Sequence, residues 1–521
     1  MVRLNSVTGI LCLLINFSLV AQDSLVSYKD LKFTSAFEKE TFGAYLKRNE
    51  KNQYLPLFLS VSSVASPTEY TNIKTRIRDI ENYLLETGIE KRKSEKKVKA
   101  VYDQIHESLL KKYEMENRFH DIFANGNYNC VSATALYALI FEDLNIPYEI
   151  KQEPTHVYLL AYPNANNIVL ETTTPLFGYL NFDPTFKENF VSNLKKQKII
   201  GNAESEQKNT DELFNIYYFT NEKIDIKKLV GIQYMNDALF KNDHGQIKEA
   251  YEQTQKAYFF YPSPRCEYML INFGSVLINT PGLPPKDRAK LIAQLARLKN
   301  HGITTDMIKG EFINLTSDLL IRQNNKALYK ECVNIIRSGV TDKETIDEVN
   351  YLYYYESGRV YYNQGNYTMA KNNFGPCMEL QPNNVDLGGM FVSTLGLTFR
   401  NERNNKSILD TLAFYQKKFP SLVENNNFNT MMSMCYVTQF GDEYNKGNVP
   451  EGDKYRRLFE DLVQSNKNIV VKSGMIGEAY GSACTYFFKN GQKTKAKEIL
   501  TKGLQLAPDS YELKVRELAF K

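Results

Sequence analysis

A chain of 521 residues is too long for one hydrophobic core, so the sequence predicts two or more domains. Its 64 lysines and arginines against 60 aspartates and glutamates leave a formal net charge of only +4, which excludes an electrostatic case for nucleic-acid binding. Tyrosine (35) and phenylalanine (30) are abundant, so aromatic side chains are available for helix packing and for partner grooves.

The first 22 residues have the pattern of a secretory signal peptide. One basic residue, Arg3, precedes an apolar run over residues 10–20, and Ala21 and Gln22 follow it. The run is too short to cross a membrane. The sequence therefore predicts an exported protein, located in the periplasm, in the cell envelope or outside the cell, with no transmembrane segment. A buried N-terminal strand is the alternative interpretation.

Two helices are predicted ahead of the central motif, over residues 67–87 and 94–116. In the second of them, Val98, Val101 and Ile105 belong to a set of apolar residues that recur at helical spacing. Acidic residues interrupt the basic run at its start, which favours a solvated helix end over a contact with an anionic surface.

A cysteine stands at the start of the next predicted helix. Asn129, directly before Cys130, is a favourable N-cap residue, and apolar side chains recur behind it at helical spacing. Cys130 therefore falls in the first helical turn, where unpaired backbone N–H groups and the helix dipole favour a thiolate. This pattern predicts a nucleophile, and a small buried core residue is the alternative.

Two short apolar strands are predicted next, over residues 154–162 and 168–173. With a hairpin turn centred on residues 163–164, His156 and Glu171 lie opposite each other on one face. A register slip of one residue would turn Glu171 to the other face. A nucleophile, a base and an orienting acid thus come together in the predicted fold. A core histidine and a surface carboxylate are the alternatives.

These residues resemble the core of the transglutaminase-like superfamily, a papain-like fold whose members use a cysteine, a histidine and an aspartate. In that family the cysteine opens a helix and the other two residues lie on successive strands. Here the helix leads into Leu-Asn-Ile-Pro at residues 144–147, and the histidine lies in Pro-Thr-His-Val-Tyr-Leu at residues 154–159. The acid position holds a glutamate in Leu-Glu-Thr-Thr.

The resemblance implies an α+β papain-like/transglutaminase-like N-terminal domain over residues 23–200. It implies that Cys130 is the nucleophile, that His156 is the base, and that Glu171 orients the imidazole with a side chain one methylene longer than the usual aspartate. The implied activity is cleavage or transfer at protein or peptide amide bonds, by proteolysis, amide hydrolysis or acyl transfer.

An oxyanion donor is expected next to the cysteine. Asn127, Tyr128 and Asn129 are candidates, and the backbone N–H of Cys130 is the preferred one.

Six cysteines follow the predicted signal peptide: Cys130, Cys266, Cys332, Cys377, Cys435 and Cys484. They are widely spaced, and the sequence has no Cys-x-x-Cys and no histidine pair at metal-ligand spacing. The sequence therefore predicts no metal site, no cofactor and no dense disulfide scaffold.

A polar stretch over residues 201–230 is predicted to be a linker, and the remainder, 231–521, to be helical. Three windows of 34 residues share one pattern there: 231–264, 351–384 and 477–510. Small residues recur where two helices must approach, glycine recurs at the turn between them, and proline closes the second helix. This pattern resembles the tetratricopeptide repeat (TPR).

The second resemblance implies an all-α TPR solenoid whose concave face binds a protein or peptide. Cys377 and Cys484 fall on small-residue positions of the pattern, so we expect them to be buried. The asparagine-rich stretches 401–405 and 425–429 are predicted to be loops. The alternative function is a catalytically inactive binding or scaffold protein of the cell envelope. The sequence does not specify the oligomeric state.

Overall fold

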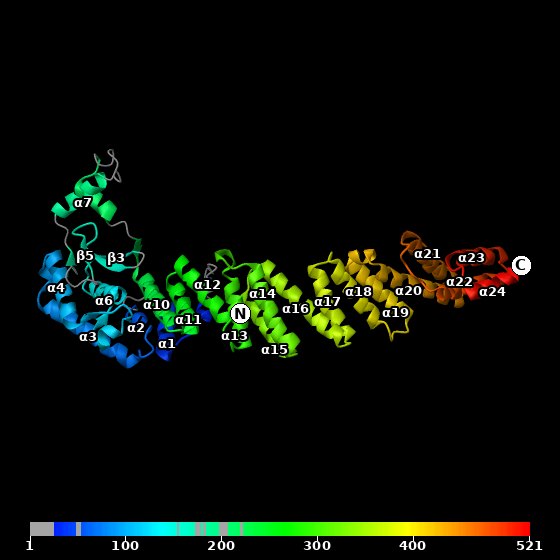
Figure 1. Ribbon diagram of the computed structural model, residues 1–521, viewed down its shortest axis with the longest axis horizontal. Helices are drawn as coiled ribbons and strands as arrows, with labels where there is room; N and C mark the ends of the chain where they lie inside the picture. Colours follow the sequence, from blue (N-terminus) through cyan, green and yellow to red (C-terminus); the bar gives the residue numbers. More distant parts are fainter. Residues whose placement is uncertain are drawn as a thin grey trace, which may run out of the picture. The chain divides into compact units, whose positions relative to one another are not determined.

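The computed structural model describes residues 25–47, 54–153, 156–171, 179–180, 184–196, 207–218 and 222–520. The predicted signal peptide lies outside the described residues, as does part of the predicted linker. None of the helices in the described part of the chain is long and apolar enough to span a membrane. The chain divides into two compact units, Met1–Ile303 and Thr304–Lys521, whose elements are labelled in Figure 1.

The first unit combines helices with a five-stranded sheet. Before the sheet the chain forms η1 (Tyr28–Asp30), α1 (Ala36–Lys47), α2 (Tyr54–Leu59), α3 (Pro67–Glu86), η2 (Ile89–Lys91), α4 (Ser94–Ser108), β1 (Lys112–Tyr113), α5 (Asp121–Ala124), β2 (Asn127–Tyr128) and α6 (Cys130–Asp143). The sheet region contains β3 (Tyr148–Gln152), β4 (Val157–Ala161), β5 (Ile168–Leu170), β6 (Tyr179–Leu180), α7 (Pro184–Lys196), α9 (Thr210–Tyr218) and β7 (Glu222–Ile224). After it come α10 (Ile226–Asp243), α11 (Ile247–Phe260), α12 (Pro264–Ile278), α13 (Pro285–Ala296) and η3 (Lys299–His301).

Helix α6 is the centre of this unit and packs against the sheet (Figure 1). The strands are ordered β6-β5-β4-β3-β7, and all neighbouring strands are antiparallel. Every residue of α6 from Val131 to Phe141 is buried, so the helix is enclosed on all sides. Strands β3 and β4 cover part of it, and α2, α3 and α10 contact it as well. This enclosure fixes the position of its first residue, Cys130.

Of the two helices predicted ahead of α6, one matches the structure and the other ends early. Helix α3 begins at the predicted residue, whereas α4 ends at Ser108 and not at residue 116. The chain leaves the helix because Leu109 and Leu110 are buried and the next residues pair with β2. The N–H of Lys111 donates to the carbonyl of Gly126 at 2.8 Å and not to a carbonyl one turn earlier, as it would in a continuing helix.

The predicted hairpin forms, but its register differs from the expected one by two residues. Leu159 lies opposite Leu170, which places Glu171 opposite Tyr158 by continuation of the ladder. Because a shift of two residues keeps a side chain on the same face of a strand, His156 and Glu171 remain on one face as diagonal neighbours. The turn that gives this register contains three residues with positive φ: Tyr162, Asn164 and Asn167.

The first unit extends past the predicted linker 201–230. Strand β7 pairs with β3 at the edge of the sheet, with Ile150 opposite Ile224. Helix α10 then contacts α2 and α6, and α11 contacts α10. The compact unit therefore ends at Ile303, because the first of the predicted repeats completes the core around α6.

A buried ion pair ties α11 to α1. Nζ of Lys256 lies 2.7 Å from Oε1 of Glu38, and both side chains are fully enclosed. The hydroxyl of Tyr234 donates to the same oxygen at 3.0 Å, and the N–H of Thr34 donates to Oε2 at 2.6 Å. Burial lowers the pKa of Lys256, and the charge of Glu38 offsets part of this effect. Buried charges are tolerated only while they remain paired, so the pair holds the two elements in one arrangement.

All regular secondary structure in the described residues of the second unit is helical. It consists of α14 (Thr305–Thr316), η4 (Ser317–Arg322), α15 (Lys326–Gly339), α16 (Lys343–Asn363), α17 (Tyr367–Leu380), α18 (Val385–Thr398), α19 (Asn405–Lys418), η5 (Pro420–Glu424), α20 (Asn426–Asn445), α21 (Val449–Ser465), α22 (Ser473–Lys489), α23 (Lys493–Leu506), α24 (Tyr511–Glu517) and η6 (Leu518–Phe520). Helices adjacent in sequence contact each other, as in α16 with α17 and α22 with α23.

All three predicted repeat windows form pairs of helices: α10 with α11, α16 with α17, and α22 with α23. The glycines of the pattern explain the pairing in α16 and α17. Gly365 has φ +74° at the turn between the helices, a conformation that side chains disfavour. A Cβ on Gly358 would lie only 2.6 Å from the Phe374 ring, so the helices could not approach as closely with a larger residue.

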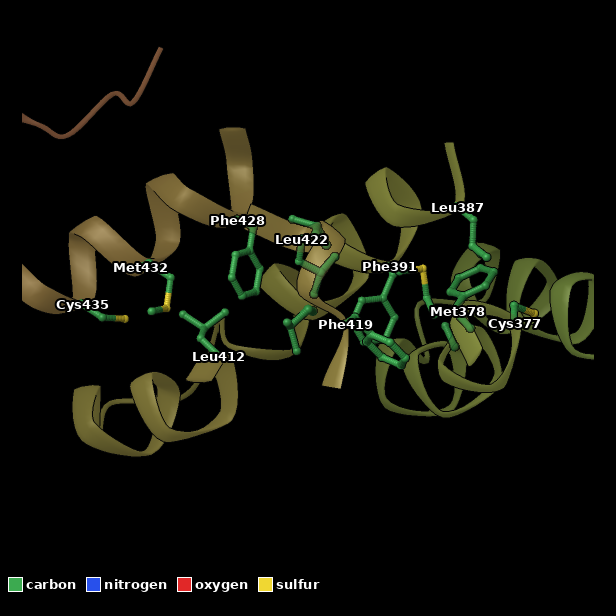
Figure 2. Packing of buried hydrophobic residues seen from close by; sticks show 14 of the residues in the cluster. Cys377, Met378, Leu387, Phe391, Leu412, Phe419, Leu422, Phe428, Met432 and Cys435 are labelled. Atoms are coloured by element: carbon green, nitrogen blue, oxygen red, sulfur yellow. The ribbon is translucent and has the colours of Figure 1, made fainter. Parts of the chain in front are cut away.

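The core of the second unit confirms the expected burial of its cysteines. Figure 2 shows Cys377 and Cys435 among apolar side chains of one cluster, and both are at most 5% exposed. Cys484 lies in a separate buried cluster. The loop prediction for residues 425–429 is wrong, because the side chain of Asn425 accepts from the N–H groups at the start of α20 and begins the helix there.

Candidate active site

Cys130 occupies the first position of α6, as the sequence predicts. The side chain of Asn129 accepts from the N–H of Ser132 at 2.9 Å, and the hydroxyl of Ser132 accepts from the N–H of Asn129 at 2.9 Å. This reciprocal capping box starts the helix at the cysteine. The thiol side chain remains half-buried, so a reactant can approach it.

The loop between β1 and α5 is hydrogen-bonded to the same helix end. Asn129 donates through its amide nitrogen to the carbonyls of Met115 and Asn117, both at 3.1 Å. The hydroxyl of Ser132 donates to the side-chain oxygen of Asn117 at 2.7 Å. Both ends of the Asn129 amide are thus engaged, which removes this side chain from the candidates for an oxyanion donor. Asn117 and Ser132 were missed in the sequence, although a serine three residues after an N-cap asparagine is a signal for such a box.

The backbone N–H groups at the start of α6 are the donors that the fold provides next to the thiol. The first N–H groups of a helix have no partner within the helix, and the cap of Asn129 satisfies that of Ser132. The N–H groups of Cys130 and Val131 are therefore placed to receive a negatively charged oxygen. This agrees with the preferred candidate among those considered in the sequence.

His156 and Glu171 meet at the end of the hairpin. Nε2 of His156 lies 2.9 Å from Oε2 of Glu171, and the two side chains are 18% and 21% exposed. The side chain of Cys130 also acts on this ring and raises the pKa of the imidazole. The structure thus brings together all three residues predicted for the site, with glutamate in contact with the imidazole. Residues 154–155 and 172–178, which flank this part of the hairpin, lie outside the described part of the chain.

The electrostatics of the site favour a charged imidazole. Burial by itself lowers the pKa of His156, but hydrogen bonds and charge interactions with Cys130 and Glu171 outweigh it and raise the pKa to about 10. The ring is therefore an imidazolium at neutral pH, held between two acidic groups. This is the state in which a histidine stabilises a neighbouring thiolate.

We expect the contribution of His156 to stability to depend on pH. Its pKa in the folded protein, about 10, exceeds the value of roughly 6.5 in an unfolded chain, so protonation favours the folded state. This contribution is complete below about pH 6.5 and is lost as the pH rises through about 10. The free energy of unfolding, measured by denaturant titration at pH 6, 8 and 10, should therefore differ most between the native protein and His156→Gln at pH 6. His244→Gln, at a histidine that is 59% exposed, is measured in parallel as the control for the substitution itself.

The remaining cysteines of the described residues are in a different environment. Cys266, Cys332, Cys377, Cys435 and Cys484 are all buried. Burial raises the pKa of Cys377 and of Cys435 to about 12. These thiols are therefore protonated and shielded at neutral pH, whereas Cys130 has a cationic partner and is accessible.

A cavity of about 380 Å³ opens beside the thiol. The following residues line it: Tyr113, Met115, Asn129, Cys130, Val131, Gln152, Glu153, His156, Val157, Ile232, Met235, Asn236, Leu239, Phe240 and Arg265. Cys130 and His156 thus share an accessible recess with side chains from α10. Among the described residues, no group of three or more histidine, cysteine or acidic side chains is arranged to hold a metal ion.

Comparison of the sequence with models of known protein families finds no match, and comparison with curated proteins finds no similar one. The assignment of a function therefore depends on the geometry of the site.

Proposed function

We propose that this protein is an exported, transglutaminase-like cysteine enzyme that acts on amide bonds of proteins or peptides, by hydrolysis or acyl transfer. The observation that carries the proposal is the chain of contacts from Cys130, at the start of α6, through His156 to Glu171. A helix N-terminus and an imidazolium both favour a thiolate, and the glutamate orients and stabilises the imidazolium. A site with these three roles filled is suited to nucleophilic catalysis.

The proposed reaction has two steps. The Cys130 sulfur attacks the amide carbonyl carbon, forming a C–S bond, and the negative charge on the oxygen faces the N–H groups at the start of α6. His156 then donates its proton to the leaving amine as the C–N bond breaks, leaving a thioester. In the second step His156 takes a proton from water or from an amine, which attacks the thioester and releases the thiolate. Water completes hydrolysis, and an amine completes acyl transfer.

The helical pairs suit a role in partner binding. They resemble TPR repeats, and stacked helical pairs of this kind offer an extended concave surface for a protein or peptide. We propose that the second unit binds such a ligand and supplies it to the site. The N-terminal residues that resemble a signal peptide support a location outside the cytoplasm.

Selective alkylation tests the proposal. At pH 6, iodoacetamide should label Cys130 in the folded protein at least tenfold faster than Cys377 or Cys435, because only Cys130 combines access with a cationic partner. The rates are measured by mass spectrometry of the cysteine peptides. If Cys130 is no more reactive than the buried thiols, the enzyme proposal is abandoned, and a non-catalytic binding or scaffold protein becomes the better reading.

A further inference from the structure

One wall of the cavity beside Cys130 is apolar and comes from α10. Ile232 and Met235 are buried, at 4% and 3% exposure, while Leu239 and Phe240 are half-buried at the cavity. Ile232, Met235 and Leu239 follow one another at spacings of three and four and share one face of the helix, Phe240 comes directly after Leu239, and the polar Asn236 lines the cavity beside them. None of them contributes to the contacts of Cys130, His156 and Glu171. Ile232 and Met235 already serve the core of the unit, whereas Leu239 and Phe240 remain partly exposed at the cavity and could contact a ligand.

The cavity lining also includes an exposed apolar residue outside α10. This residue is Met115, and 74% of its large side chain is exposed. The loop that carries it is held in place, since the carbonyls of Met115 and Asn117 both accept from the amide of Asn129. Covering this exposed apolar side chain with an apolar part of a ligand would remove its surface from water and so favour binding.

The edge of the cavity offers a polar group suited to a peptide backbone. The side-chain oxygen of Gln152 accepts from the hydroxyl of Tyr261 at 3.0 Å, which orients the amide so that its NH₂ group is the donor that remains. Gln152 lies on β3, at the end next to the chain segment that carries His156. The carbonyl oxygen of an extended peptide could accept a hydrogen bond from this NH₂ group.

We propose that this cavity is the subsite for an apolar side chain of a peptide substrate, of the size of leucine, methionine or phenylalanine, on the acyl side of the amide that Cys130 attacks. The inference rests on the proposed function and specifies its substrate class. The cavity of about 380 Å³ is at the small end of ligand sites, so it accepts a short peptide segment. An apolar side chain is preferred because α10 contributes Ile232, Met235, Leu239 and Phe240 to the lining, and burying a carboxylate against them is unfavourable, although the lining also holds the charged Glu153 and Arg265 and the polar Asn236.

Two peptidyl chloromethyl ketones test the subsite, identical except for leucine or aspartate next to the reactive group, with iodoacetamide as a probe that has no side chain. In each case the thiolate forms a C–S bond and halide leaves. The leucine probe should label Cys130 at least tenfold faster than the aspartate probe, while iodoacetamide reports the thiol alone. Equal rates for the two peptide probes, with fast iodoacetamide labelling, would overturn the subsite and leave the proposed function standing. Absent labelling by iodoacetamide would overturn the proposed function and the subsite with it.

Matched variants locate the subsite on the wall. Leu239→Asn and Met115→Asn, which remove apolar surface without adding charge, should each lower the ratio of leucine to aspartate labelling toward one, with each rate divided by the iodoacetamide rate of the same variant. Leu85→Asn, on α3 outside the cavity and 42% exposed, is the control and should leave the ratio as it is. If Leu85→Asn changes the ratio as much as Leu239→Asn, or if neither cavity variant changes it, the proposed subsite is wrong.

Discussion

Replacing His156 with alanine is expected to lower the rate of Cys130 alkylation at pH 6 by roughly 10- to 100-fold. The pKa of His156 is raised to about 10, so at pH 6 its ring carries a positive charge next to the thiol. Without this charge, the helix N-terminus alone favours the thiolate. An ordinary thiol, with a pKa near 8.5, is almost entirely protonated at pH 6. The rate is read from the Cys130 peptide by mass spectrometry.

Two further variants separate the roles of the neighbouring groups. Glu171→Gln should reduce the rate less than His156→Ala, because glutamine can still hydrogen-bond to the imidazole although it carries no charge. His244→Ala, at an exposed histidine of the same unit, should leave the rate unchanged. A fast reaction of Cys130 that persists in His156→Ala would leave a reactive nucleophile without its base, and the proposed mechanism would have to be given up.

Replacing Glu38 with glutamine is expected to reduce the free energy of unfolding by about 3–5 kcal/mol. The carboxylate is fully enclosed, lies 2.7 Å from Nζ of Lys256 and accepts from Tyr234 and Thr34. Glutamine removes the negative charge and turns one of the two acceptors into a donor. Lys256 then loses the counter-charge that it contacts directly, and Glu252 and Asp237 remain as its other acidic neighbours. The value is measured by denaturant titration at pH 7, with the transition of the first unit followed separately from that of the second.

A second substitution shows whether the loss comes from the unpaired cation. The double variant Glu38→Gln with Lys256→Met should be more stable than Glu38→Gln alone, because neither charge of the pair remains. As a matched control, Asp103→Asn breaks the ion pair with Lys99, whose side chains are 61% and 55% exposed, and should cost less than about 1 kcal/mol. If Glu38→Gln costs no more than Asp103→Asn, the ion pair does not hold α11 to α1.

The stability of this pair also bears on the proposed subsite. Lys256 lies on α11, which packs on α10, and α10 supplies the apolar wall beside Cys130. A loosened α11 would therefore disturb the wall before it disturbs the capped start of α6. In this way a buried pair far from the thiol in sequence supports the shape of the cavity.

The local features of this protein could be predicted from its amino-acid sequence. The asparagine cap placed Cys130 at the start of a helix, because capping depends on neighbouring residues. The spacing of the glycines predicted the helical pairs. Gly358 lies where the two helices approach closely, and Gly365 has a positive φ at the turn between them. The sequence put His156 and Glu171 on one face only for an assumed register, and the observed register differs from it by two residues, which preserves that face.

Features that depend on residues distant in sequence could not be predicted and are seen in the folded structure. Helix α4 ends early because its following residues pair with β2, and the first repeat joins the first unit because α10 completes the core around α6. The pairing of Glu38 with Lys256 is not visible in sequence, since neither residue has a local reason to be buried. The same holds for the cavity, whose lining brings the apolar wall of α10 together with Met115. The physical reason is that burial and long-range pairing are set by which surfaces meet, whereas caps, turns and periodicity are set by neighbours along the chain.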